Sequence, residues 1–213
     1  MFTTDYLGAL MPFLSLLAKL TTIVAALLIV IDPLGVMPII IGLNASAGVR
    51  VTRRIILRVI GGSIILLLFF TVTGTWVLRL FQMHISDMQI GGGLLLLIIA
   101  LKLVTEGRYG PDGEEHHSSA TIPLISPMIV GPGAITATVV LAAQHGVWMT
   151  SAAVLLALLI CLIIFLSARL IHRIIGDGAA NLLSRLMGVF VAAIAIAYIR
   201  AGVLAFIKLA SSG

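Results

Sequence analysis

The stretch IVIDPLGVMPIII, from Ile29 to Ile41, interrupts an apolar run with one aspartate, two prolines and a glycine. Proline cannot donate a backbone hydrogen bond, and it moves the residue before it out of the helical region. Only one of two prolines in this spacing can take the tolerated first position of a helix. The stretch therefore predicts unwound backbone from Asp32 to Met37 and a helix that restarts at Pro38.

The composition around this break is that of an integral membrane protein. Of 213 residues, 61% are hydrophobic and 10% are charged, and the mean hydropathy is +1.23. A spanning helix needs about 20 mostly apolar residues, so a chain of this length holds roughly six. The expected spans are 19–47, 55–81, 88–105, 121–145, 150–175 and 181–207. Residues 1–18 either extend the first span or lie on the membrane surface.

The chain reads as two similar halves. ISPMIVGP, Ile125 to Pro132, matches IDPLGVMP, Ile31 to Pro38, at four of eight positions, and the same offset of 94 places Arg79 on Arg173. Three spans in each half is an odd number, so the second half must enter the membrane from the opposite side. We therefore expect an all-α membrane protein with inverted three-helix repeats, each with a broken first helix. The expected divisions are a single membrane domain 1–213, a first repeat 19–105, a cytoplasmic linker 106–120 and a second repeat 121–208.

The basic residues are distributed unequally between the two expected faces. Nine of them, Arg50, Arg53, Arg54, Arg58, Lys102, Arg108, Arg169, Arg173 and Arg185, fall on one face, and four, Lys19, Arg79, Arg200 and Lys208, on the other. Lys and Arg accumulate on the cytoplasmic side. The asymmetry predicts a multi-pass protein of the cell inner membrane with both termini outside, and explains the net charge of +5 without nucleic acid as a partner.

The two breaks are the candidate binding site for a small-molecule substrate. In inverted halves, the helices that restart at the breaks aim their N-termini at the bilayer centre, where unpaired N–H groups favour an anionic group. Asp32 is the deep acidic side chain of the spans, although it could serve only as an N-cap. The expected substrate-binding residues are Asp32, Pro33, Gly35, Pro38, Ser126, Pro127, Gly131, Pro132, Gly133 and Thr136.

At these residues the chain resembles a known family. IDPLGVMP, SPMIVGPGAI, QIGGGLLLLIIALKLV and LLSRLMGVF are similar to segments of the MarC family of bacterial and archaeal inner-membrane proteins. The resemblance implies six spans and, as described for some relatives, transport of small neutral amino acids such as glycine and alanine. Relatives often have Asn at the position of Asp32, so the resemblance does not imply an obligate proton carrier there.

The function expected from these features is secondary transport by alternating access around the two broken helices. A channel, or another membrane protein without coupled transport, is the alternative, because unwound helices also build selectivity filters. We expect no enzyme, since Asp177 lies in an expected loop and the histidines fall at span ends. No cofactor or metal is expected, and proton or sodium coupling and homo-oligomer formation are left open. Membrane lipid is the other expected partner.

Three weaker motifs are expected to be structural. Glu114 to His117 are consecutive residues in a polar loop and cannot easily converge on one metal ion. The glycines at 91–93, together with Gly188, are expected to permit close helix packing. Thr71, Thr73 and Thr75 are expected to bond back to their own helix, with a pore-lining role as the alternative.

Overall fold

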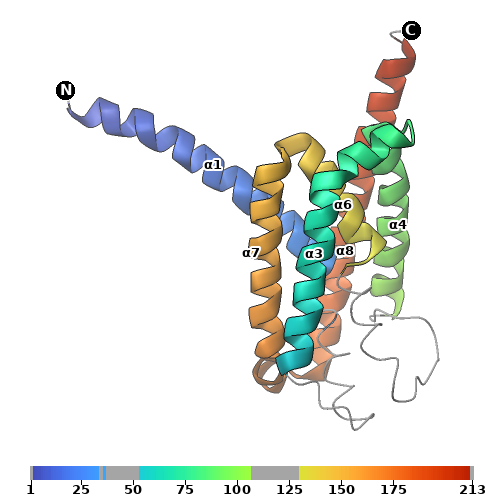
Figure 1. The fold of residues 1–213 in the computed structure, drawn as a ribbon. Helices are drawn as coiled ribbons and strands as arrows, with labels where there is room; N and C mark the ends of the chain where they lie inside the picture. Colours follow the sequence, from blue (N-terminus) through green and yellow to red (C-terminus); the bar gives the residue numbers. More distant parts are fainter. Residues whose placement is uncertain (1, 34–35, 37–52, 107–129, 212–213) are drawn as a thin grey trace.

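The computed structural model describes residues 2–33, 36, 53–106 and 130–211. Within them, the chain is helical almost throughout (Figure 1). The helices are α1 (Phe2–Ile31), α3 (Arg53–Leu80), α4 (Ile85–Glu106), α6 (Pro132–His145), α7 (Val147–Leu166) and α8 (Ala168–Ser211).

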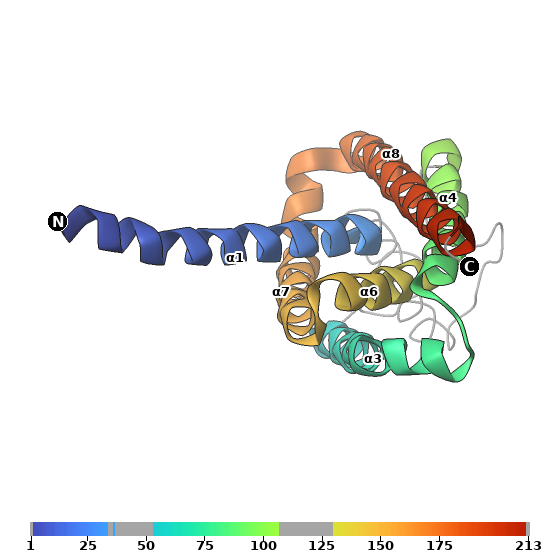
Figure 2. The same ribbon diagram turned by 90° about the horizontal axis from the view of Figure 1, so that it is seen from above.

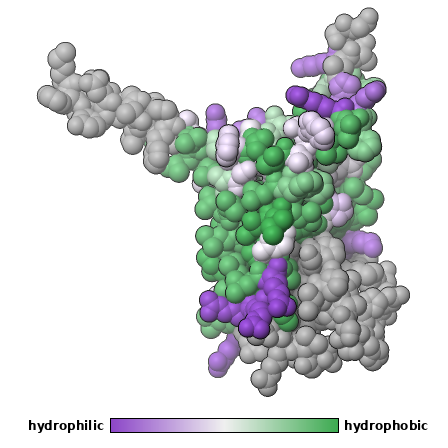
Figure 3. Space-filling model, in the orientation of Figure 1, coloured by the Kyte–Doolittle hydropathy of each residue, from purple (hydrophilic) through white to green (hydrophobic). Residues whose placement is uncertain are grey.

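The structure supports an all-α integral membrane protein. In the described residues, five helical segments are long and apolar enough to cross a membrane, namely 14–31, 53–80, 85–105, 147–166 and 185–208. The fourth expected span contains α6, which has 14 residues and is therefore shorter than a span. The surface between the ends of the bundle is mostly apolar, and hydrophilic residues gather at the two ends (Figure 3).

The helices alternate in direction. In Figure 1, α3 ascends, α4 descends, α6 ascends, α7 descends and most of α8 ascends, while α1 descends into the bundle from the side. Arg53 begins α3 and Arg79 lies in its last turn, so the two expected sets of basic residues lie at opposite ends of this helix.

The N-terminal residues extend the first helix. The helix α1 is continuous from Phe2, and its N-terminal half projects away from the other helices (Figures 1 and 2). Burial begins at Ile23 and continues to Ile31, where α1 enters the bundle. The described part of residues 1–18 is therefore helical and continuous with the first span.

The expected loop before the last span is wrong. Helix α7 ends at Leu166, and α8 then runs without interruption from Ala168 to Ser211, so Asp177 lies in a helix. In both views, the first part of α8 crosses the end of the bundle before the helix rises beside α4 (Figures 1 and 2). Gly176 and Gly178 suggested a loop, but helical hydrogen bonding continues through them.

The short helix α6 lies at the centre of the bundle. Figure 2 shows α6 enclosed by α1, α3, α4 and α7. Its buried positions are Gly133, Ala134, Thr136, Ala137, Thr138, Val139, Val140, Leu141 and Ala142, which together cover every side of the helix. A helix that is buried on all sides belongs to the core. The element that carries the second break is thus the most enclosed helix described.

Glycines bring α4 and α8 together along their length. A Cβ placed on Gly188 would lie 2.9 Å from the Leu103 Cβ, and one on Gly93 would lie 2.9 Å from the Ala195 carbonyl oxygen. One on Gly202 would lie 2.7 Å from the Ser86 carbonyl oxygen. The structure confirms the packing role expected for Gly92, Gly93 and Gly188, whereas Gly91 faces open space.

Candidate functional site

The first break is a single residue among those described. Asp32 is 1% exposed and has a φ of 45°, in the left-handed region. Its N–H donates to the Leu28 carbonyl at 2.9 Å, and its carbonyl accepts from the Val36 N–H at 3.2 Å. Asp32 therefore ends one helix and begins the next.

This geometry corrects the expected position of the restart. Pro33 and Val36 are helical, so the described residues contain no unwound stretch from Asp32 to Met37, and the helix restarts at Pro33 instead of Pro38. The first position of a helix tolerates proline, and aspartate visits the left-handed region more readily than most residues. One residue can therefore redirect the chain.

The second break lies at the start of α6, within the matched stretch from Ile125 to Pro132. Pro132 is the first residue of the helix, and Gly131 is the N-cap, with φ −66° and ψ 168°. Among the described residues, no side chain caps this end. The first backbone N–H groups of a helix lack partners within the helix, and the helix dipole places positive potential there. This end of α6 can therefore interact with an anionic group.

The two breaks lie near each other inside the bundle. The end of α1 and the start of α6 are neighbours at a similar depth in both views (Figures 1 and 2). Ile31, Val36, Val130 and Ala134, which flank the breaks, belong to one buried apolar cluster. Asp32, which is 1% exposed, and the start of α6 thus both adjoin the apolar core, where charge interactions are stronger than in water.

The structure places only some of the expected site residues. Asp32, Pro33, Gly131, Pro132 and Gly133 lie at the two breaks. Gly35, Pro38, Ser126 and Pro127 lie outside the described residues. Gly133 borders α4, because a Cβ there would lie 2.5 Å from the Leu96 side chain.

Thr136, another expected site residue, contacts α4 above the break. A Cβ placed on Gly92 would overlap its side chain, so the two helices touch at this point. On the other side of α6, a Cβ on Gly74 of α3 would lie 2.5 Å from Val139. Two glycines therefore pack α6 against α4 and α3, at positions between the start of α6 and its pocket-lining end.

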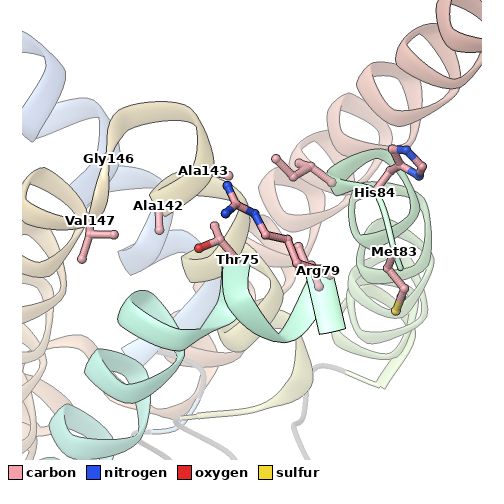
Figure 4. A pocket seen from close by; sticks show the side chains of 10 residues that line it. Thr75, Arg79, Met83, His84, Ala142, Ala143, Gly146 and Val147 are labelled. Carbon is pink, nitrogen blue, oxygen red and sulfur yellow. The ribbon is translucent and has the colours of Figure 1, made fainter. Parts of the chain in front are cut away.

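A pocket of about 480 Å³ lies beyond these contacts, at the end of α6 opposite the break (Figure 4). Its lining residues are Thr75, Leu78, Arg79, Met83, His84, Ile85, Ala142, Ala143, Gly146 and Val147. Thr75 and Arg79 extend towards the last turn of α6, whereas the His84 ring points away (Figure 4). The pocket includes none of the residues at the breaks.

The expected sites did not include this pocket or the Gly74 contact. Their sequence signals are weak, because one glycine in TVTGT and a pair of alanines in LAAQH are ordinary in a membrane helix. Among the hydroxyls, Thr71 and Thr73 donate to carbonyls four residues earlier, as expected, and Ser63 of the same helix does so as well. Thr75 instead lines the pocket.

No cluster of metal-binding side chains occurs in the described residues. Glu114 to His117 lie outside them.

Comparison with known proteins gives a family. The sequence model of the MarC family of integral membrane proteins matches residues 17–207. A UPF0056 membrane protein of Archaeoglobus fulgidus is 34% identical over 184 residues, covering 81% of this chain and 86% of that protein. One from Methanocaldococcus jannaschii is 31% identical, with coverage of 84% and 83%, and one from Aquifex aeolicus is 26% identical, with coverage of 86% and 91%. No solved structure matches significantly.

Proposed function

The chain belongs to the MarC family of integral membrane proteins, and from its two helix breaks we propose that it is a secondary transporter of small neutral amino acids. The observation that carries the proposal is the short helix α6, whose Gly131 N-cap makes no side-chain capping bond and whose start lies inside the bundle beside the end of α1 (Figure 2). Helix breaks inside membrane proteins are typical of transporter sites for small solutes.

The chemistry of the breaks favours a zwitterion. The uncapped N-terminus of α6 offers N–H donors and positive potential to a carboxylate. The Asp32 carboxylate offers an acceptor for an ammonium group. Of the residues whose burial is described, no Lys or Arg is buried, which disfavours a dianionic solute. A small amino acid without a charged side chain fits these groups best.

Alternating access requires the site to open to one side at a time. The contacts of Thr136 with Gly92 and of Val139 with Gly74 pack α6 against its neighbours between the breaks and the pocket. Movement of α6 away from α3 or α4 would open this route, and an opposite movement would open the other side. These two glycine contacts are the proposed gate towards the Arg79 end.

We also propose that the halves are inverted repeats and that the Arg79 end lies outside the cytoplasm. The helix directions support the repeats: α1, α3 and α4 run down, up and down, whereas α6, α7 and most of α8 run up, down and up (Figure 1). The unequal basic residues support an inner-membrane protein with both termini outside. A proton or a sodium ion is the proposed coupling ion.

The test is counterflow in vesicles that contain the purified protein. Vesicles loaded with unlabelled alanine and diluted into trace labelled glycine should transiently accumulate label above its equilibrium level. A carrier gives this overshoot because it exchanges solutes across the membrane, whereas a channel only equilibrates them. Equilibration without overshoot would support the channel alternative. Absence of glycine and alanine movement under proton and sodium gradients, while another solute class moves, would contradict the substrate assignment.

A further inference from the structure

We propose that the pocket at the outer end of α6 binds the headgroup of an anionic phospholipid, with the phosphate at Arg79. This site is distinct from the proposed solute site. Its walls come from the ends of α3 and α6 and the starts of α4 and α7.

The pocket offers a cation without a partner of opposite charge. Among the described residues that line it, Arg79 and His84 can be cationic and none is acidic. The Arg79 guanidinium makes no hydrogen bond or ion pair within the described part of the chain. The nearby Asp87 is engaged elsewhere, because its carboxylate accepts from the His84 backbone N–H at 2.8 Å. Five N–H donors of a guanidinium therefore remain available to a phosphate.

The position of Arg79 matches the headgroup level of a membrane. The chain has two tryptophans, Trp76 and Trp148, and both lie at this end with 67% and 90% exposure. Tryptophan gathers at membrane–water interfaces. Trp76 follows Thr75, and Trp148 follows Val147, so a tryptophan adjoins the pocket lining on two sides. A lipid phosphate is thus at the correct depth to reach Arg79.

The size and walls of the pocket favour a lipid over the transported solute. At about 480 Å³, the pocket is in the range of ligand sites for molecules much larger than glycine. Beyond Arg79 and Thr75, the walls are mainly apolar, with Leu78, Met83 and Ile85 available to glycerol and the first acyl carbons. Ala142 and Ala143 have small side chains, which leave space for the headgroup above the last turn of α6.

The experiment measures lipid-dependent stability of the full chain. Purified protein in neutral detergent micelles receives phosphatidylglycerol, phosphatidylcholine with the same acyl chains, inorganic phosphate or glycine. Because a ligand of the folded state stabilises it, phosphatidylglycerol should raise the apparent unfolding temperature by about 3 °C or more above phosphatidylcholine. Arg79→Gln should abolish the difference, and Ala143→Phe should do so by filling the pocket. The matched control Arg200→Gln removes an exposed charge on α8, outside the pocket lining, and should retain it.

Four results would overturn the proposal. Equal stabilisation by inorganic phosphate would indicate a free-anion site, and stabilisation by glycine that depends on Arg79 would indicate a solute vestibule. If Arg200→Gln also loses the stabilisation by phosphatidylglycerol, the effect is a general charge attraction to the micelle. If Ala143→Phe keeps the stabilisation by phosphatidylglycerol, the lipid binds outside the pocket. Counterflow is measured separately, so failure of the transport proposal leaves this result unaffected.

Discussion

Asp32 combines a backbone role with a side-chain role in one buried residue. Its positive φ redirects the chain between two helices, and it directly follows α1, whose end neighbours the start of α6 (Figure 2). The left-handed region costs most residues about 1–2 kcal/mol, glycine nothing, and asparagine and aspartate less than most. Substitutions at this position can therefore separate the effect of the backbone conformation from the effect of the carboxylate.

We predict that Asp32→Asn folds and keeps glycine transport, since asparagine tolerates the backbone and retains an oxygen acceptor. Asp32→Gly should fold at least as well but lose transport, because the side chain is gone. Asp32→Ala should lose both transport and about 1 kcal/mol of stability through backbone strain. Thermal unfolding in detergent and vesicle counterflow check these outcomes. Full transport by Asp32→Gly would mean that the carboxylate does not bind solute.

A residue larger than glycine does not fit at position 92, because the Thr136 side chain occupies the space of its Cβ. Gly91, beside it, has no atom within 4 Å of an added Cβ. We predict that Gly92→Leu lowers stability by about 1–3 kcal/mol or more through overpacking, whereas Gly91→Leu is close to neutral. The unfolding temperatures of the two variants can be measured by size-exclusion chromatography after heating. Similar losses of stability in both variants would contradict the contact between Gly92 and Thr136.

At the scale of elements, the sequence indicated which helices break, but it placed the restart of the first one incorrectly. Prolines made the breaks predictable, and Pro132 indeed begins α6. In the first half, the restart at Pro33 depends on the positive φ of Asp32. Aspartate tolerates this conformation, but tertiary packing determines whether it is adopted. The expected loop at Asp177 was wrong for a related reason, since two glycines can bend a helix without ending it.

The pocket and the contacts around α6 could not be predicted, because they depend on which glycine faces which neighbour. Gly92 and Gly93 are adjacent in sequence, but one borders α6 and the other α8. Composition identifies such residues as packing sites in general. Only the three-dimensional arrangement assigns their partners.

Helices α4 and α8 should move as one unit. They contact through Gly93, Gly188 and Gly202 at three levels, so sliding would create clashes.

At the scale of the whole molecule, the distribution of basic residues predicts orientation. Among the described residues, Arg53, Arg54 and Arg58 lie at the start of α3, opposite the end that carries Arg79. We predict that alkaline phosphatase fused after Gly213 is active and that a fluorescent protein inserted in residues 107–120 fluoresces in the cytoplasm. The reverse pair of signals would contradict the orientation while leaving the helix arrangement intact.

The central claim is that the breaks at Asp32 and Gly131 form one solute site. Its most direct test is a cysteine at position 131, in a chain with Cys161 replaced by serine, labelled by a small water-soluble thiol reagent. The φ of −66° at this position accepts a side chain without strain. We predict that glycine slows labelling when residue 32 is Asp or Asn and has no effect when it is Gly. Equal protection in all three variants, or none in any, would contradict a shared site.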